Sequence, residues 1–560
     1  MLNYKRYKRN PVLNFPERTW PDKQIEKAPI WCSVDLRDGN QALIEPMNVD
    51  EKMEMFDLLL RLGFKEIEIG FPAASQIEYV FLRKLVAENK IPDDVKVQVL
   101  TQCRQELVDR TFEAIQGIKN VVVHIYNSTS TLQRDVVFNK SQDEIIDIAI
   151  AGTRMVKEHL ADFDGNVQLE YSPESFTGTE VDFALRICTA VQKEWDHATD
   201  APIIFNLPAT VEMNTPNVYA DQIEWMSTHF EDRDNIILSV HPHNDRGTGV
   251  AITELALLAG ADRVEGTLLG NGERTGNVDI LTVAYNMFSQ GINPELEIED
   301  VKEIVEIYER CCKMHVDMRH PYAGKLVFTA FSGSHQDAIN KGVHAMQERG
   351  NEYWEVPYLP IDPADIGRKY EPVVRINSQS GKGGVAFVMD TVYGYKLPKK
   401  MQREFADVIQ YISEQEGGEV EPQKMMEAFK KEYFENKMPF ELVFVDIDDN
   451  MANDETHVSL DFKYNGKAIH SEADGNGPID AVKLAVKQCV PQVDFSVLDY
   501  SEHSLGKGSG AKAAAYIEMR DNRSGNITFG VGVSSNITRA SIRGMFSAMN
   551  RLAKKANDYV

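Results

Sequence analysis

Residues 30–70 read IWCSVDLRDGNQALIEPMNVDEKMEMFDLLLRLGFKEIEIG, and this stretch decides the fold of the chain. Short β-rich runs at 30–35 and 66–70 flank a helical segment in which Met53 and Phe56 recur at helical spacing. Mostly apolar strands that alternate with amphipathic helices are typical of a parallel sheet covered by helices. The stretch therefore predicts one strand–helix–strand unit of an α/β protein.

The same alternation continues along the next two hundred or so residues. Six further β-rich runs follow, each after a helical segment: VKVQVL (95–100), NVVVHI (120–125), NVQLEY (166–171), PIIFN (202–206), IILSV (236–240) and RVEGT (263–267). Eight units of this length predict a closed (β/α)8 TIM barrel. A doubly wound open sheet is the alternative, but no Gly-x-Gly-x-x-Gly motif follows the first strand. The barrel predicts catalytic groups at the C-terminal ends of strands.

The predicted domains are a catalytic barrel at 30–325, a helical linker and lid region at 326–437, and an α+β domain at 438–560. Pro-rich and Gly-rich stretches interrupt the linker region. The last domain shows two similar stretches, 441–500 and 501–556, each with strands followed by a helix. This pattern indicates an internal repetition.

The composition limits the partners of the chain. Its 560 residues carry a formal net charge of -26, which argues against a broad nucleic-acid-binding surface. No apolar run is long enough to span a membrane, and the segment 1–29 reads as an arm rather than a secretory signal. Six cysteines without a regular framework indicate a reducing compartment, so we expect a cytoplasmic protein.

Two predicted strand ends carry metal-ligand residue types. Strand 1 runs into Arg37 and Asp38, and strand 7 ends in His241 and His243 around a single proline. Because residues i and i+2 of a strand face the same side, the two imidazoles can point at one ion. Two imidazoles and a carboxylate from Asp38 predict a divalent-metal site with open positions, and by ligand softness they suit Zn, Mn or Co.

Glycine-rich loops provide two further candidates. The segment 270–277, after strand 8, holds three glycines that let the backbone approach a ligand, and its last residue, Asn277, can supply a fourth, oxygen ligand. In the last domain, the stretches 474–478 and 506–510 read as turns before helices. Such turns can hold a small anionic or zwitterionic ligand on backbone N–H groups.

Five motifs carry a resemblance to a known family: DGNQ (38–41), GFPAAS (70–75), HPHND (241–245), GNGERTGN (270–277) and SGSHQDA (332–338). The chain resembles the α-isopropylmalate synthases, members of the TIM-barrel superfamily of acyl-CoA-condensing enzymes and metallolyases. The resemblance covers essentially the whole chain, and Asn40 matches the branch shared with fungi and mycobacteria.

The resemblance implies a Claisen-type condensation of acetyl-CoA with 2-oxoisovalerate and water, which gives 2-isopropylmalate and CoA. This reaction would be the first committed step of leucine biosynthesis, and leucine would inhibit it from the last domain. The family also implies a homodimer and a divalent metal, Mg or Mn with Zn still open. Potassium is a further expected activator.

The resemblance implies site residues as well. The implied metal ligands are Asp38, His241, His243 and Asn277. Arg37 would stabilise negative charge on the developing oxygen and bind substrate, and Glu68 would orient Arg37 by an ion pair. The implied keto-acid contacts are Glu174 and Thr210. His335 and Tyr358 match linker residues that reach into the partner subunit's barrel, where His335 would assist proton transfer.

Rival functions on the same scaffold stay open at this point. Citramalate and homocitrate synthases differ in the keto-acid pocket, although homocitrate synthases commonly lack the last domain. A lyase of the hydroxymethylglutaryl-CoA type would cleave a carbon–carbon bond on the same barrel. A leucine sensor built on an inactive barrel is the non-enzymatic alternative.

Overall fold

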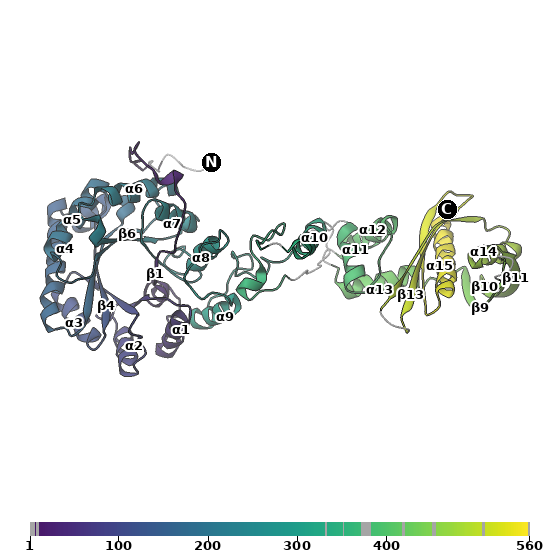
Figure 1. Ribbon diagram of the computed structural model, residues 1–560, viewed down its shortest axis with the longest axis horizontal. Helices are drawn as coiled ribbons and strands as arrows, with labels where there is room; N and C mark the ends of the chain where they lie inside the picture. Colours follow the sequence, from purple (N-terminus) through teal and green to yellow (C-terminus); the bar gives the residue numbers. More distant parts are fainter. Residues whose placement is uncertain are drawn as a thin grey trace. The chain divides into compact units, whose positions relative to one another are not determined.

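Eight parallel strands close into a barrel in sequence order (Figure 1). They are β1 (Ile30–Ser33), β2 (Glu66–Gly70), β3 (Lys96–Gln102), β4 (Asn120–Ser128), β5 (Asn166–Glu174), β6 (Ile203–Ala209), β7 (Ile236–Pro242) and β8 (Arg263–Gly266). Pairing of β1 with β8 completes the circle. The predicted TIM barrel is confirmed, and an open sheet is excluded.

Eight helices surround the barrel (Figure 1). They are α1 (Val49–Arg61), α2 (Gln76–Ala87), α3 (Gln105–Ile115), α4 (Gln142–His159), α5 (Val181–Trp195), α6 (Pro216–His229), α7 (Gly249–Leu258) and α8 (Ile280–Phe288). The first begins with a capping box between Asn48 and Glu51, and it buries Met55, Phe56 and Leu59 against the sheet. Local capping and apolar periodicity thus agree with the fold.

The computed structural model describes residues 6, 10–330, 333–350, 352–370, 382–416, 420–450, 455–506 and 510–557. The chain divides into two units, Met1–Val327 with Ile361–Lys369 and Phe328–Pro360 with Tyr370–Val560. The first unit holds the barrel and α9 (Val301–Cys312). Among the described residues, no helix is both long and apolar enough to cross a membrane.

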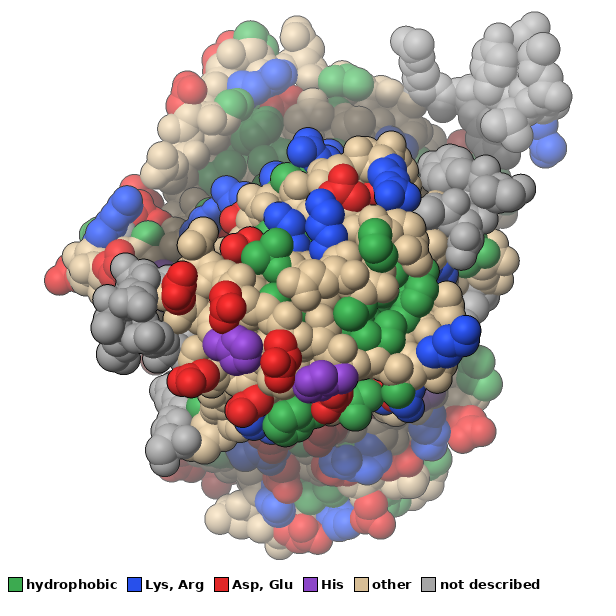
Figure 2. All heavy atoms as spheres, turned by 90° about the vertical axis from the view of Figure 1, so that its right-hand side faces the viewer, with side chains coloured by type: hydrophobic (Ala, Val, Ile, Leu, Met, Phe, Trp, Pro, Cys, Tyr) green, Lys and Arg blue, Asp and Glu red, His purple; other side chains and the backbone are tan. Residues whose placement is uncertain are grey.

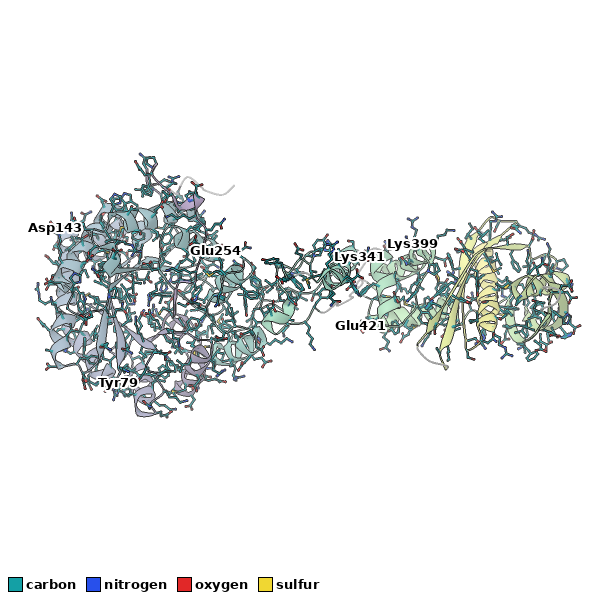
Figure 3. All side chains as sticks on the ribbon, in the orientation of Figure 1. Tyr79, Asp143, Glu254, Lys341, Lys399 and Glu421 are labelled. Carbon is teal, nitrogen blue, oxygen red and sulfur yellow. The ribbon has the colours of Figure 1, made fainter. Side chains whose placement is uncertain are left out.

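Polar side chains join neighbouring helices on the outside of the barrel. Asp143 on α4 accepts a hydrogen bond from Arg186 on α5 at 2.9 Å, and Glu254 on α7 accepts one from Asn286 on α8 at 2.7 Å. Figure 3 labels Asp143 at the outer edge of the barrel unit. The exposed ion pair between Asp143 and Arg186 contributes only about 0.2–1 kcal/mol, so the buried core holds the barrel together.

The interior of the barrel contains a buried ionic layer. The fully buried guanidinium of Arg263 donates to Glu66 at 2.6 Å, to Glu265 at 2.9 Å and to Gln98 at 2.6 Å. Barrels of this kind are usually filled by branched apolar side chains. Buried charges persist only when they are paired and hydrogen-bonded, so these four residues fold as one network.

The second unit begins with helices and ends with two small sheets. Its helices are α10 (Gly333–Arg349), α11 (Lys382–Thr391), α12 (Lys399–Glu416), α13 (Pro422–Tyr433), α14 (Pro478–Cys489) and α15 (Ile537–Asn557). Its antiparallel strands are β9 (Phe440–Asn450), β10 (Glu455–Tyr464), β11 (Lys467–Gly475), β12 (Phe495–Leu505), β13 (Lys512–Asp521) and β14 (Ile527–Ser534). Three strands and a helix therefore occur twice, as the repetition predicted.

Two details of the sequence predictions for the last domain are wrong. The second repeat begins with β12 at Phe495 rather than at residue 501, because the polar, mostly exposed strand carries no clear apolar alternation. The stretch 506–510 joins β12 to β13 instead of preceding a helix, and residues 507–509 lie outside the described residues. The predicted domain limits at residues 29, 325 and 437 stay predictions.

The outer faces of the two small sheets differ in chemistry. Tyr516, Phe529 and Val531 of the β12–β14 sheet share a core with α11, α12 and α13. The corresponding face of the β9–β11 sheet carries His457 and His470, paired with Asp474 and Asp461 at 2.7 and 2.8 Å. Figure 2 shows acidic and histidine side chains gathered there. The apolar face needs a protein cover, whereas the polar face is stable in water.

Candidate metal centre at the barrel mouth

Asp38, His241 and His243 converge on one point at the C-terminal end of the barrel. The Oδ2 atom of Asp38 lies 3.6 Å from Nε2 of His241 and 3.7 Å from Nε2 of His243. All three donor atoms lie within 4.8 Å of one another. The structure therefore brings the three predicted ligands together.

Local backbone geometry aims these side chains. His241 belongs to β7, and His243 lies two residues on, so both rings face the same side. Asp38 belongs to a π-helical turn, Asp35–Gly39, that directly follows β1. Single π-helical turns occur frequently at functional sites.

Asn277, the predicted fourth ligand, lies at the same point. Its Oδ1 atom is 2.8 Å from Nε2 of His241, while its Nδ2 donates to the carbonyl of Asn271 at 2.9 Å. A Cβ at Gly272 would lie 2.2 Å from that Nδ2, and a Cβ at Gly276 would lie 1.8 Å from the carbonyl oxygen of Gly270. Glycine is therefore required for the loop to bring Asn277 to the histidines.

The residues present fit a divalent cation. Oδ2 of Asp38 and Nδ1 of His243 are buried and have no hydrogen-bond partner among the described residues. A buried polar atom without a partner is costly, and a cation between the three side chains would satisfy the carboxylate. His241 donates from Nδ1 to Glu265 at 2.7 Å, the outer contact that metal-ligating histidines commonly make.

Burial and neighbouring charge set the protonation of the ligands. Burial lowers the pKa of His243, and the charge of His241 lowers it further, to about 4, so its ring is neutral at pH 7. Burial also lowers the pKa of His241, but Asp38 and Glu265 more than offset this and raise it to about 9. A cation must therefore displace a proton from His241. Burial raises the pKa of Asp38, yet Arg37 and the histidines hold it well below its ordinary value.

Arg37 lies beside this centre and is fixed in place. Its Nε donates to Oε2 of Glu68 at 2.6 Å, and its Nη1 donates to Oδ1 of Asp38 at 3.0 Å. Glu68 is fully buried and also lies 3.1 Å from Nδ1 of His124. The predicted ion pair between Arg37 and Glu68 is present in the structure.

A cavity of about 280 Å³ opens above the centre. Glu174 and Thr210 line it, as do Arg37 and the predicted metal ligands Asp38, His241 and His243. Glu174 accepts a hydrogen bond from Ser128, and the hydroxyl of Thr210 accepts one from the backbone N–H of Ser175 at 3.0 Å. Both predicted keto-acid contacts therefore lie at the cavity.

His335 and Tyr358 belong to the second unit. Their rings stack on one another, with centroids 4.1 Å apart and planes 28° apart. The structure thus pairs these two predicted residues with each other.

Several residues that line the cavity had no individual role predicted from the sequence. They are Gln41, Leu100, His124, Tyr126, Ser172, Asn206, Pro208, Glu273 and Arg274. His124 is the clearest omission, because its Nε2 is 2.7 Å from Oγ of Ser172 and its other nitrogen contacts Glu68. A polar residue near the C-terminal end of an otherwise apolar strand is the signal that points to it.

Family comparisons agree with this architecture. The HMGL-like family matches residues 28–307, the post-catalytic domain-like region of α-isopropylmalate synthase matches residues 325–390, and the LeuA allosteric (dimerisation) domain matches residues 419–553. The HMGL-like family depends on divalent metals. The barrel and its centre therefore define a metal-dependent enzyme of the HMGL-like class.

Curated relatives match over nearly their full length. The 2-isopropylmalate synthase of Clostridium acetobutylicum is 54% identical over 98% of this chain and 99% of the relative. Those of Acetoanaerobium sticklandii and Agrobacterium fabrum are 51% and 52% identical, over 100% and 98% of this chain and 98% of each relative. The chain belongs to the 2-isopropylmalate synthase family.

Proposed function

We propose that the chain condenses acetyl-CoA with 2-oxoisovalerate and water to give 2-isopropylmalate and CoA, the first committed step of leucine biosynthesis. The observation that carries this proposal is the meeting of Asp38, His241 and His243 beside the ion-paired Arg37 in one cavity. Sequence identities of 54% and 51% to curated 2-isopropylmalate synthases, over 98% and 100% of this chain, support the same reaction.

The metal ligands would be Asp38, His241, His243 and Asn277. A divalent cation held there supplies Lewis-acid polarisation of a keto carbonyl. Arg37 faces the same space, and Glu68 holds its guanidinium rigidly through a 2.6 Å contact. A positive charge fixed in advance stabilises the negative charge that develops on the keto oxygen during carbon–carbon bond formation.

Two apolar residues in the otherwise mostly polar lining of the cavity would receive the branched apolar end of the keto acid. Leu100 and Pro208 supply apolar surface, whereas Arg274 at the rim is already paired with Asp245 at 2.6 Å. A second carboxylate, as in 2-oxoglutarate, would lose its hydration against Leu100 and Pro208 without a free cationic partner there. Glu174 and Thr210 would contact the keto acid from the ends of β5 and β6.

The metal would be Mg²⁺ or Mn²⁺, with Zn²⁺ as the alternative, and K⁺ would act as an activator. Two imidazoles with oxygen donors suit several divalent first-row ions, so availability and geometry decide between them. The acidic net charge of -26 adds a general attraction for cations.

A homodimer would complete each active site. His335 and Tyr358 of one chain would enter the partner's barrel, where His335 assists proton transfer. Leu132, Val136 and Val137 support an interface at the barrel, because they follow β4 at its C-terminal end and are 71%, 71% and 67% exposed. Adjacent exposed apolar side chains of this kind mark protein contacts.

Leucine would act as feedback inhibitor in the C-terminal domain, which matches the LeuA allosteric (dimerisation) domain. The glycine-rich turn 474–478 leads into α14, whose free backbone N–H groups can receive a carboxylate. Inhibition from a domain other than the barrel requires that leucine favour one of two states of the dimer. The reaction would take place in the cytoplasm.

A thiol-release assay tests the proposed reaction. Acetyl-CoA is supplied with 2-oxoisovalerate, pyruvate or 2-oxoglutarate, and free CoA is measured. We expect the highest kcat/KM with 2-oxoisovalerate, no release without a keto acid, loss of activity with chelator and inhibition by leucine. Preference for pyruvate would indicate a citramalate synthase, and preference for 2-oxoglutarate a homocitrate synthase.

A further inference from the structure

A fully buried lysine contacts the turn that carries Arg37 and Asp38. Lys52 on α1 donates from Nζ to the carbonyl of Leu36 at 2.8 Å and to Oε1 of Glu78 on α2 at 2.7 Å. The ring of Phe81 lies 5.3 Å from the same nitrogen. Lysine is almost never fully buried unless its charge is paired, so this arrangement is specific.

Gly70 makes room for the partner of this lysine. A Cβ at Gly70 would lie 1.6 Å from Oε2 of Glu78, and the φ of Gly70 is +147°. Gly70 ends β2, two residues beyond Glu68, which holds Arg37. The strand end, α1 and α2 therefore meet at the turn, and only glycine lets the carboxylate of Glu78 reach Lys52.

Leu36 immediately precedes the two functional residues. The turn Asp35–Gly39 is π-helical, a conformation that is rare and occurs mostly as single turns. Fixing the carbonyl of Leu36 fixes the peptide from which Arg37 continues, and so the directions in which Arg37 and Asp38 project. Metal and substrate sites need a placement within about 0.5 Å, which neighbouring hydrogen bonds provide.

We propose that Lys52 and Glu78 are positioning residues that hold the Arg37–Asp38 turn in the geometry required for metal and keto-acid binding. This role rests on the metal site proposed above. In this role neither residue contacts the substrate. A purely structural role predicts lower stability alone, whereas positioning predicts weaker metal binding in a protein that is still folded.

The experiment titrates metal-free, full-length protein with Mn²⁺ and measures the free ion. Lys52→Met is compared with the double variant Lys52→Met/Glu78→Gln, which leaves no unpaired buried charge and therefore keeps the fold. The matched control is Lys84→Met, because Lys84 joins α2 to Asp50 on α1 at 3.0 Å but lies on the exposed side. Gly70→Ala tests the contact between Lys52 and Glu78 by placing a Cβ where the carboxylate of Glu78 lies.

We expect both Lys52 variants and Gly70→Ala to bind Mn²⁺ about 10–100-fold more weakly than wild type, as for other contacts outside the ligand shell, and to show reduced kcat. Lys84→Met should bind Mn²⁺ as wild type does. A folded double variant with wild-type Mn²⁺ affinity and kcat overturns the inference. If Asp38→Asn leaves Mn²⁺ binding unchanged, the proposed metal site itself is wrong, and the inference falls with it.

Discussion

Glu265 accepts a hydrogen bond from Nδ1 of His241 at 2.7 Å, which leaves Nε2 of that ring to face Asp38 and Asn277. Glu265 is itself fully buried and held by Arg263 at 2.9 Å. The ionic layer inside the barrel thus continues into the metal centre. The Nδ1 atom of His241 is held by Glu265, and the Nε2 atom is directed at the site where a cation would bind.

Glu265→Gln should weaken metal binding. The amide cannot accept the Nδ1 proton as strongly as the carboxylate, so the His241 ring loses orientation and basicity, and we expect about 10–100-fold lower Mn²⁺ affinity. Equilibrium titration of the metal-free protein measures it. Glu66→Gln is the control, because Glu66 also binds Arg263, at 2.6 Å, but does not touch a ligand. Equal losses in both variants would contradict a specific role for Glu265.

Arg37→Gln should lower kcat by about 100–1,000-fold, the effect of removing one fixed donor to a developing oxyanion. The thiol-release assay with 2-oxoisovalerate measures the change, and metal content is determined in parallel. Arg61→Gln removes an exposed ion pair with Glu303 and should leave kcat unchanged. A near-normal kcat in Arg37→Gln would show that another group meets the negative charge.

Metal removal should abolish activity and lower the melting temperature together. A cation present at a hundred times its Kd stabilises the folded protein by about 2.7 kcal/mol, and a chelator removes this contribution. Differential scanning calorimetry with and without chelator measures the shift. In Asp38→Asn the chelator should have little further effect. A chelator-dependent shift of wild-type size in that variant would place the cation elsewhere.

Two inactive variants should complement one another if the active site is shared between subunits. Asp38→Asn damages the barrel of its own chain, whereas His335→Ala damages the partner's site. Co-expression gives mixed dimers with one intact site, and about a quarter of the wild-type activity is expected from random pairing of a two-fold symmetric dimer. Activity no higher than in the single variants would mean that each chain uses its own His335.

Acid should weaken the second unit through Glu404. Burial raises the pKa of Glu404, but the ion pair with Arg551 more than offsets this, so its folded pKa lies below the ordinary value. The stabilisation is therefore complete above the unfolded pKa and is lost as pH falls through the folded pKa. At pH 7, Glu404→Gln should cost about 1–3 kcal/mol.

Urea unfolding at neutral and acid pH measures this difference. The gap between wild type and Glu404→Gln should shrink as pH falls. Glu414→Gln changes an exposed carboxylate on the same helix, which accepts a hydrogen bond from Gln410 at 2.9 Å, and should show no comparable gap. A gap for Glu404→Gln that is independent of pH would contradict the role of its charge.

Sequence patterns predicted the strands best where local signals are strong. The prediction for β2 coincides with the structure at Glu66–Gly70, because a helix and a glycine flank the apolar run. The β4 and β5 runs extend three residues further, to Ser128 and Glu174. Tyr126, Ser172 and Glu174 of these extensions line the cavity, so the apolar periodicity ends before the strand does.

The site was predicted unevenly for a similar reason. His241 and His243 are two residues apart, so strand geometry alone places them on one side. The roles of Lys52 and Glu265 depend on partners that lie far away in the sequence, and a single polar residue gives no local signal of its partner. Gly70 and Gly272 likewise look like ordinary glycines in the sequence. Only the structure shows which atoms occupy the space that a Cβ would need there.

The sequence by itself determined that eight strand–helix units close into a barrel and that the ends of β1 and β7 carry the ligand types of a divalent cation. Periodicity and spacing are local properties, and parallel strands bring their C-terminal ends to one rim whatever fills the interior. Only the tertiary structure decided that Arg263 and Glu265 support His241 from inside the barrel, and that Lys52 reaches Leu36. Buried charges must find partners wherever the fold places them, because an unpaired charge away from water is too costly to persist.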